Sequence, residues 1–188
     1  MCGDNVQDMS GAYGSYNITV NSQIANERYW ERYYSNSVTR KTLICGYYEP
    51  NVISSCNNLK IAACGNNVTN MHGAYANCHN LLYATCGPNV IDMSNAYYNC
   101  ANLKTAVCGP NVTDMSYAYY SCENLETATC GSNVTSMSNT YDHCQKLLTA
   151  VCGPNVTDMS YAYYNCANLK TAACNNNVTN MSRTYCNC

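Results

Sequence analysis

One stretch recurs at a fixed interval along this chain and limits what it can fold into more than any other feature. The clearest copy runs from Cys86 to Val107. Further copies begin at Cys64, Cys108, Cys130, Cys152 and Cys174, so the step from each copy to the next is constant. A fixed period in the twenties is typical of a solenoid, in which each repeat packs only on its neighbours. The sequence therefore predicts a stack of coils.

Apolar residues recur with helical spacing in the first half of each repeat. In the copy that begins at Cys108, positions i, i+3, i+4 and i+7 are filled by Met115, Ala118, Tyr119 and Cys122. This spacing places them on one face of an α-helix, and a side-chain oxygen of Thr113 or Asp114 is placed to cap its N-terminus. The helix has only about two turns, so it must be held by packing.

The second half of each repeat changes to the alternation of a strand. Leu125-x-x-Ala128-x-Cys130 ends in this pattern. A turn follows the strand pattern in each repeat, as the Gly-Pro-Asn of residues 109–111 does after the strand that ends at Cys108. We therefore predict an α/β repeat solenoid with one parallel strand and one short helix per 22-residue repeat. Its stacked strands would lie about 4.8 Å apart.

An asparagine stands three residues after the first cysteine of every repeat. These residues are Asn67, Asn89, Asn111, Asn133, Asn155 and Asn177. Stacked in a column, their amides would form a structural ladder by bonding the turn backbone of the next coil. An alternative is that each asparagine only stabilises its own turn. Five of the six begin an Asn-Val-Thr glycosylation sequon, but the ladder accounts for them and we expect no glycans there.

Two stretches resemble known repeat families. Leu-x-x-Ala-x-Cys-x-x-Asn resembles the leucine-rich-repeat signature. Asn-Val-Thr-Asp-Met-Ser-Tyr-Ala-Tyr-Tyr-Asn-Cys-Ala-Asn-Leu, residues 155–169, is similar to the BspA-like repeats of bacterial surface proteins. The resemblance covers roughly Cys45 to Cys188 and, more weakly, Cys2 to Tyr16. It implies a non-catalytic solenoid used for adhesion or protein recognition. Where that family usually has Phe, this chain has Tyr97, Tyr119 and Tyr163.

Composition narrows the classes of partner. Only 11% of the residues are charged and the net charge is −2, which argues against binding nucleic acid through phosphates. Polar residues interrupt every apolar run, so no membrane span is expected. The first ten residues have neither a basic region nor an apolar core, so no signal peptide is visible. A cell surface or a virion is the suspected location, and lysis of a phage host would be one route there.

The chain divides into two unequal parts. We predict an atypical repeat with an aromatic and charged insertion over residues 1–44, and the solenoid, with an incomplete last repeat, over 45–188. The insertion is either a cap or a docking segment, whose candidate partner-binding residues are Arg28, Tyr29, Trp30, Arg32 and Tyr33. No polar cap follows the last repeat, so we expect this end to contact another chain or to continue.

The cysteines and histidines offer little chemistry. Two classes of cysteine recur at core positions, where cysteine acts as a small hydrophobe, so we favour buried thiols over disulfides or zinc. Cys186 stands off the pattern; we favour a simple exposed thiol there, and bridging to another chain is the alternative. His72, His79 and His143 occupy unrelated repeat positions and are expected to be surface residues. We predict no enzyme, no metal and no cofactor.

The outward face of the strands is the second candidate partner site. Its first column is Ile61, Tyr83, Thr105, Thr127, Thr149 and Thr171, and its second is Ala63, Thr85, Val107, Thr129, Val151 and Ala173. We expect it to hold a protein or a glycan, although a solvated sheet is an equal alternative. The main functional alternative is an assembly subunit, such as a phage fibre component, that self-associates through the solenoid ends. The Thr127-x-Thr129 pattern is similar to that of ice-binding solenoids, so ice binding is a more distant alternative.

Overall fold

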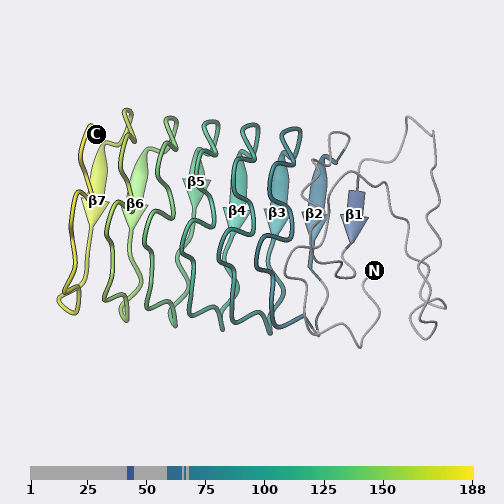
Figure 1. Cartoon of the computed structure of the whole chain (residues 1–188), viewed down its shortest axis with the longest axis horizontal. Helices are drawn as coiled ribbons and strands as arrows, with labels where there is room; N and C mark the ends of the chain where they lie inside the picture. Colours follow the sequence, from purple (N-terminus) through teal and green to yellow (C-terminus); the bar gives the residue numbers. More distant parts are fainter. Residues whose placement is uncertain (1–41, 45–58, 65, 67) are drawn as a thin grey trace.

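The computed structural model describes residues 42–44, 59–64, 66 and 68–188, which form a single row of stacked coils (Figure 1). The strands are very short, and all of them lie on the same side of the row. They are β1 (Thr42–Ile44), β2 (Ile61–Ala63), β3 (Tyr83–Thr85), β4 (Thr105–Val107), β5 (Thr127–Ala128), β6 (Thr149–Val151) and β7 (Thr171–Ala173).

Neighbouring strands pair in parallel and in the register that the repeat predicts. Thr105 of β4 lies beside Thr127 of β5, and Thr149 of β6 lies beside Thr171 of β7. The parallel strand of the predicted repeat is therefore confirmed. The first two strands are separated by less than one full repeat of sequence, since Leu43 of β1 lies beside Ala62 of β2. The first strand that the structure describes thus lies just before Cys45, where we placed the start of the solenoid, and the division into two parts stays a prediction.

The sheet is interrupted between β5 and β6. It consists of a five-stranded part, β1 to β5, and a two-stranded part, β6 and β7. Just before the interruption, at the ends of β4 and β5, the amide of Cys108 donates to the hydroxyl of Thr129 (3.3 Å), whereas the equivalent amide of Cys86 donates to a backbone carbonyl. On the other side of the coils the backbone bonds continue, because the amide of Met137 donates to the carbonyl of Asp158 (2.8 Å). The stack is therefore continuous.

The predicted helix is wrong. Over residues 115–122, and at the equivalent positions of the other described coils, the chain forms consecutive turns and no helix. The amide of Ala118 donates to the carbonyl of Met115 (2.9 Å), but the amide of Tyr119 donates to Thr140 of the next coil (2.9 Å). An α-helix needs the amide of Tyr119 to reach the carbonyl four residues back, so bonding between coils takes the place of the helix.

Two residues per coil make these turns possible by adopting positive φ angles. In the coil that begins at Cys108 they are Tyr117 (φ 57°) and Ser121 (φ 55°). The left-handed conformation reverses the local direction of the backbone, so alternate amides point along the stack instead of back into their own turn. Most equivalent residues in the other coils are asparagine, such as Asn95 and Asn99, which tolerates this conformation well.

The predicted apolar stripe forms the core. In the coil that begins at Cys108 its six members are fully buried, namely Val112, Met115, Ala118, Tyr119, Cys122 and Leu125. Side chains at i, i+3, i+4 and i+7 converge on one interior whether the backbone is helical or a series of turns. The core prediction is therefore confirmed although the helix is not.

A column of stacked tyrosines runs through this core. Tyr75, Tyr97, Tyr119, Tyr141, Tyr163 and Tyr185 follow one another with ring centroids 5.3–5.6 Å apart and interplanar angles of 2–15°. The hydroxyls of Tyr119 and Tyr163 are buried and have no hydrogen-bond partner. A buried hydroxyl without a partner costs about 1–3 kcal/mol. The column therefore combines favourable ring stacking with the energetic cost of burying unpaired hydroxyl groups.

Glycines in the turn allow the coils to approach each other closely. A Cβ atom on Gly131 would lie 2.8 Å from the carbonyl oxygen of Gly109 and 3.2 Å from the sulfur of Cys108. The corresponding clash at Gly153 is with the carbonyl oxygen of Gly131, at 2.5 Å. In the last coil the position is Asn175, whose side-chain amide donates to the carbonyls of Gly153 and Val156.

Candidate binding surfaces

The outward side of the strands forms a continuous surface, here called the strand face. In β3, β4 and β6 the side chains at the first and third positions are exposed to solvent, and the alanine between them, such as Ala106, is buried. The structure therefore brings the two predicted columns together side by side. All six residues of the first column are exposed, namely Ile61, Tyr83, Thr105, Thr127, Thr149 and Thr171.

The strand face also collects exposed apolar side chains. Eight large hydrophobic residues are exposed in the described part of the chain. Five of them lie on or beside the strand face, namely Ile61, Tyr83, Val107, Leu148 and Val151. Val151 is the most exposed of these, at 63%. The column just before the strands adds charge, with exposed Lys104 and Lys170 and the exposed carboxylate of Glu126 between them.

The turn asparagines donate hydrogen bonds from one coil to another. The Nδ2 atom of Asn111 donates to the carbonyl of Pro88 (2.8 Å), and that of Asn133 donates to the carbonyl of Pro110 (2.9 Å). Equivalent bonds are made by Asn89, Asn155 and Asn177. In each case the acceptor belongs to the preceding coil, whereas we expected it in the next one. These hydrogen bonds link adjacent turns, so the asparagine side chains stabilise the stack.

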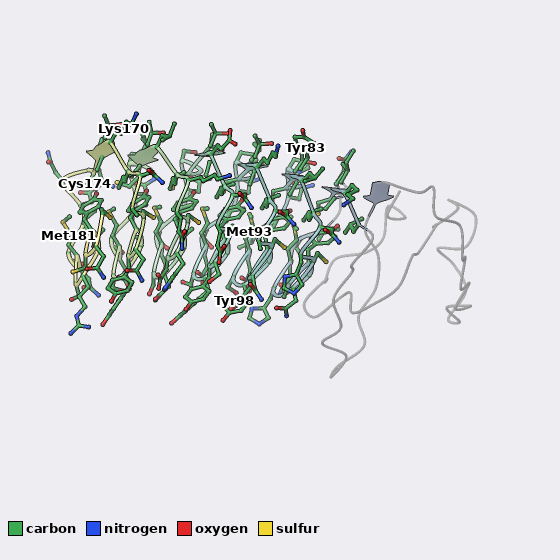
Figure 2. All side chains as sticks on the ribbon, turned by 90° about the horizontal axis from the view of Figure 1, so that it is seen from above. Tyr83, Met93, Tyr98, Lys170, Cys174 and Met181 are labelled. Carbon is green, nitrogen blue, oxygen red and sulfur yellow. The ribbon has the colours of Figure 1, made fainter. Side chains whose placement is uncertain are left out.

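A second surface, which the sequence did not lead us to expect, lies on the opposite side of the coils. Figure 2 shows Tyr83 and Lys170 on the strand side and Tyr98 at the far side. We call this surface the tyrosine row, and its members are Tyr98, Tyr117, Tyr120, His143, Tyr161, Tyr164 and Arg183. All seven side chains are exposed or half-buried.

Ring contacts join the members of the tyrosine row. Tyr98 stacks on Tyr120 with centroids 4.8 Å apart, and Tyr117 lies tilted against Tyr120 at 5.9 Å. A second tilted pair follows two coils later, where Tyr161 lies against Tyr164 at 5.6 Å. These two pairs repeat the same arrangement on a common surface.

A polar network occupies the coil between the two tyrosine pairs. His143 contacts the rings of Tyr120 (5.8 Å) and Tyr164 (6.2 Å). Its Nδ1 atom lies 2.6 Å from Oδ1 of Asp142, and its Nε2 atom lies 2.9 Å from the amide of Asn165. Burial raises the pKa of Asp142, and the neighbouring His143 opposes this shift. The network fixes His143 in one orientation, with its ring between the two pairs.

Burial raises the pKa of several cysteine thiols. It raises the pKa of Cys86 and of Cys108 to about 12, and that of Cys130 to about 11. In the second class, the thiol of Cys122 donates to the carbonyl of Tyr97 (3.2 Å), and Cys144 does the same to Tyr119 (3.2 Å). Protonated, hydrogen-bonded thiols are poor nucleophiles. No disulfide joins the cysteines of the described residues.

The remaining candidate residues do not converge on a reactive centre. His72 lies 2.6 Å from the hydroxyl of Ser94, far along the stack from His143, and His79 is in a third column. Within the described ranges no group of three or more histidine, cysteine or acidic side chains is placed to hold a metal ion. The predicted docking segment, with Arg28, Tyr29, Trp30, Arg32 and Tyr33, lies outside the described residues, as does Asn67.

The sequence does contain a signal for the tyrosine row. Tyr98, Tyr120 and Tyr164 share one repeat position, directly after the core tyrosine. Under the helical interpretation this position is an ordinary solvated one. The turns instead stack these side chains along the outer surface, which brings rings from different coils into contact.

Nothing in the described part of the chain is a helix long and apolar enough to cross a membrane.

The family model for the BspA-type leucine-rich repeat region matches in six copies, over residues 17–104 and 93–188. Among solved structures, a leucine-rich repeat protein from Bacteroides ovatus is similar, with 17% identity and a TM-score of 0.47. The match covers 66% of this chain and 39% of that chain. A search of curated proteins gave no match.

Proposed function

Because the chain belongs to the BspA-type leucine-rich repeat family, we propose that it is a non-catalytic recognition or adhesion protein whose strand face binds a partner protein. We place this activity at a bacterial surface or on a phage virion. The family supports the general role, since leucine-rich repeat proteins commonly mediate protein interactions. The described surfaces support the choice of the strand face.

One observation carries the proposal, namely the gathering of exposed apolar side chains on the strand face. Contiguous apolar surface on a soluble protein commonly marks an interaction site. Tyr83, Val107 and Val151 are each about half exposed or more, at 48%, 53% and 63%. The strands of Tyr83 and Val107 pair with a neighbouring strand on each side, and the strand of Val151 pairs with β7, so little ordering is needed when a partner binds.

The charges beside the strand face indicate the chemistry of the partner. Lys60, Lys104 and Lys170 share the column next to the strands with the single carboxylate of Glu126. A partner surface with apolar side chains at its centre and acidic side chains at its rim would complement this arrangement. Rim charges of this kind mainly raise the rate of association, so binding should weaken as salt concentration rises.

We expect an aspartate at Val107 or Val151 to abolish adhesion while leaving the fold intact. Each substitution places a carboxylate where the partner's apolar surface must be desolvated, which should weaken binding at least about tenfold. The measurement is adhesion of beads coated with the chain to bacterial and animal cells, before and after the cells are treated with protease. Circular dichroism checks the fold of each variant.

Ile91→Asp is the matched control, because Ile91 is as exposed as Val107 (51% against 53%) but lies outside the strands. Adhesion that survives protease treatment, or that Ile91→Asp reduces as strongly as Val151→Asp, would contradict binding of a protein by the strand face.

The assembly alternative stays a prediction. At the last described coil, Met181 is 44% exposed and all three residues of β7 are exposed. A following coil or a partner chain would cover this surface equally well. Association through it would leave adhesion by the strand face unchanged, so Met181→Asp separates the two roles.

A further inference from the structure

The tyrosine row has features that the stacking of coils does not require. The core is complete without it, because the buried tyrosines already fill the interior. Tyr117 is 38% exposed and has a positive φ angle. The same position is occupied by Asn95 and Asn139 in the neighbouring coils. A bulky residue at positive φ is unfavourable. Two coils therefore retain tyrosine where the fold alone would favour asparagine.

The row is aromatic and polar but almost uncharged. The carboxylate of Asp142 is buried and held by His143. The remaining charge belongs to Arg183 at one end, whose guanidinium lies 5.8 Å from the centre of the Tyr161 ring. Phenol hydroxyls, amides and an imidazole supply hydrogen-bond donors and acceptors between apolar ring surfaces. This combination suits a neutral ligand that carries many hydroxyl groups over an apolar skeleton.

We propose that the tyrosine row binds a neutral glycan chain that runs along the axis of the solenoid. The tilted pairs Tyr117–Tyr120 and Tyr161–Tyr164 form two equivalent subsites, and His143 lies between them. The proposal goes beyond recognition of a protein by the strand face, because it concerns the opposite side of the coils and another class of ligand.

The spacing of the two pairs supports an extended polymer. The pairs are two coils apart, which corresponds to about 10 Å at roughly 4.8 Å per coil. An extended β-1,4-linked hexose polymer advances by nearly this distance for every two sugar rings. Successive equivalent units of such a chain can therefore meet equivalent tyrosine pairs, whereas a compact ligand would reach only one of them.

The row is also organised before any ligand binds. Tyr98 supports Tyr120 by stacking, and the amide of Asn187 donates to Asn165, which in turn contacts His143. Side chains that are already held in place lose little conformational entropy on binding. A protein is the less favoured occupant, because Tyr117 is the one member of the row among the large exposed hydrophobic residues of the described chain.

The test is affinity electrophoresis through gels that contain dextran, mannan, galactan or a mixed-linkage β-glucan, with a polyuronate gel for comparison. We expect at least one neutral polysaccharide to retard the chain. The double variant Tyr117→Asn, Tyr161→Asn should weaken that retardation about tenfold or more. Asparagine occupies the same position in other coils, so the variant is expected to fold.

Tyr83→Thr is the control, because it removes an exposed tyrosine from the strand face and introduces the residue found at Thr105. It should leave the retardation unchanged. No retardation by any neutral polysaccharide, retardation by the polyuronate alone, or equal effects of the double variant and the control would overturn the proposal. So would a protein ligand whose binding the double variant abolishes. None of these outcomes depends on adhesion through the strand face.

Discussion

Replacing Tyr119 by alanine should lower the free energy of unfolding by about 3–5 kcal/mol, the usual cost of removing a fully buried aromatic side chain. The ring is completely buried and lies between those of Tyr97 and Tyr141, each 5.5 Å away. Its removal opens a cavity in the centre of the column and breaks two stacking contacts. Urea denaturation followed by circular dichroism measures the change.

Removing only the hydroxyl of Tyr119 should have the opposite effect. Tyr119→Phe deletes a buried polar atom that has no hydrogen-bond partner, so we expect a gain of about 1 kcal/mol. Tyr120→Ala is the control for both variants, because Tyr120 is adjacent but half-buried, and should cost only about 1 kcal/mol through its contact with Tyr98. Equal losses from Tyr119→Ala and Tyr120→Ala would contradict a shared tyrosine interior.

Replacing Gly131 by alanine should cost about 1–3 kcal/mol, the usual cost of forcing extra atoms into a packed interior. Two effects oppose each other at this position. Alanine restricts the unfolded chain, which favours the folded state by about 0.4–1 kcal/mol. Its Cβ atom, however, would lie 2.8 Å from the backbone oxygen of Gly109, and neither backbone can move without separating the coils. The clash should therefore outweigh the entropic gain.

Ser132→Ala, at the next residue of the same turn, is the control for Gly131→Ala. Ser132 is exposed, so its variant should change the free energy of unfolding by less than about 0.5 kcal/mol. The midpoint of urea denaturation distinguishes the two variants. A stabilising effect of Gly131→Ala would mean that adjacent turns are farther apart than the structure places them.

Much of the fold can be predicted from the sequence because the repeat is a strict one. The period fixes which residues become neighbours, so Thr105 pairs with Thr127 as the copies require. The apolar stripe identifies the core for the same reason. The helix is the exception, because the spacing of Met115, Ala118 and Tyr119 is the same for a helix and for the turns that form instead.

The difference between helix and turns lies in the backbone, at the residues with positive φ. Asparagine at Asn95, Asn99 and Asn165 is a local signal for that conformation. Tyr117 and Tyr161 give no such signal, because aromatic residues are rarely left-handed. The tyrosine row depends on these turns, so a sequence interpreted as helical could not reveal it. The columns of the strand face needed only the register and were accessible from the sequence.

Contacts between the rings of the core tyrosines test the stacking of the coils most directly. In protein with protonated tyrosine and all other residues deuterated, nuclear Overhauser effects between ring protons report which tyrosines are neighbours. The structure predicts that the rings of Tyr97, Tyr119 and Tyr141 each contact two others, namely the core tyrosine of the preceding coil and that of the following coil. Contacts that skip a coil, or none between these rings, would contradict the stacked solenoid.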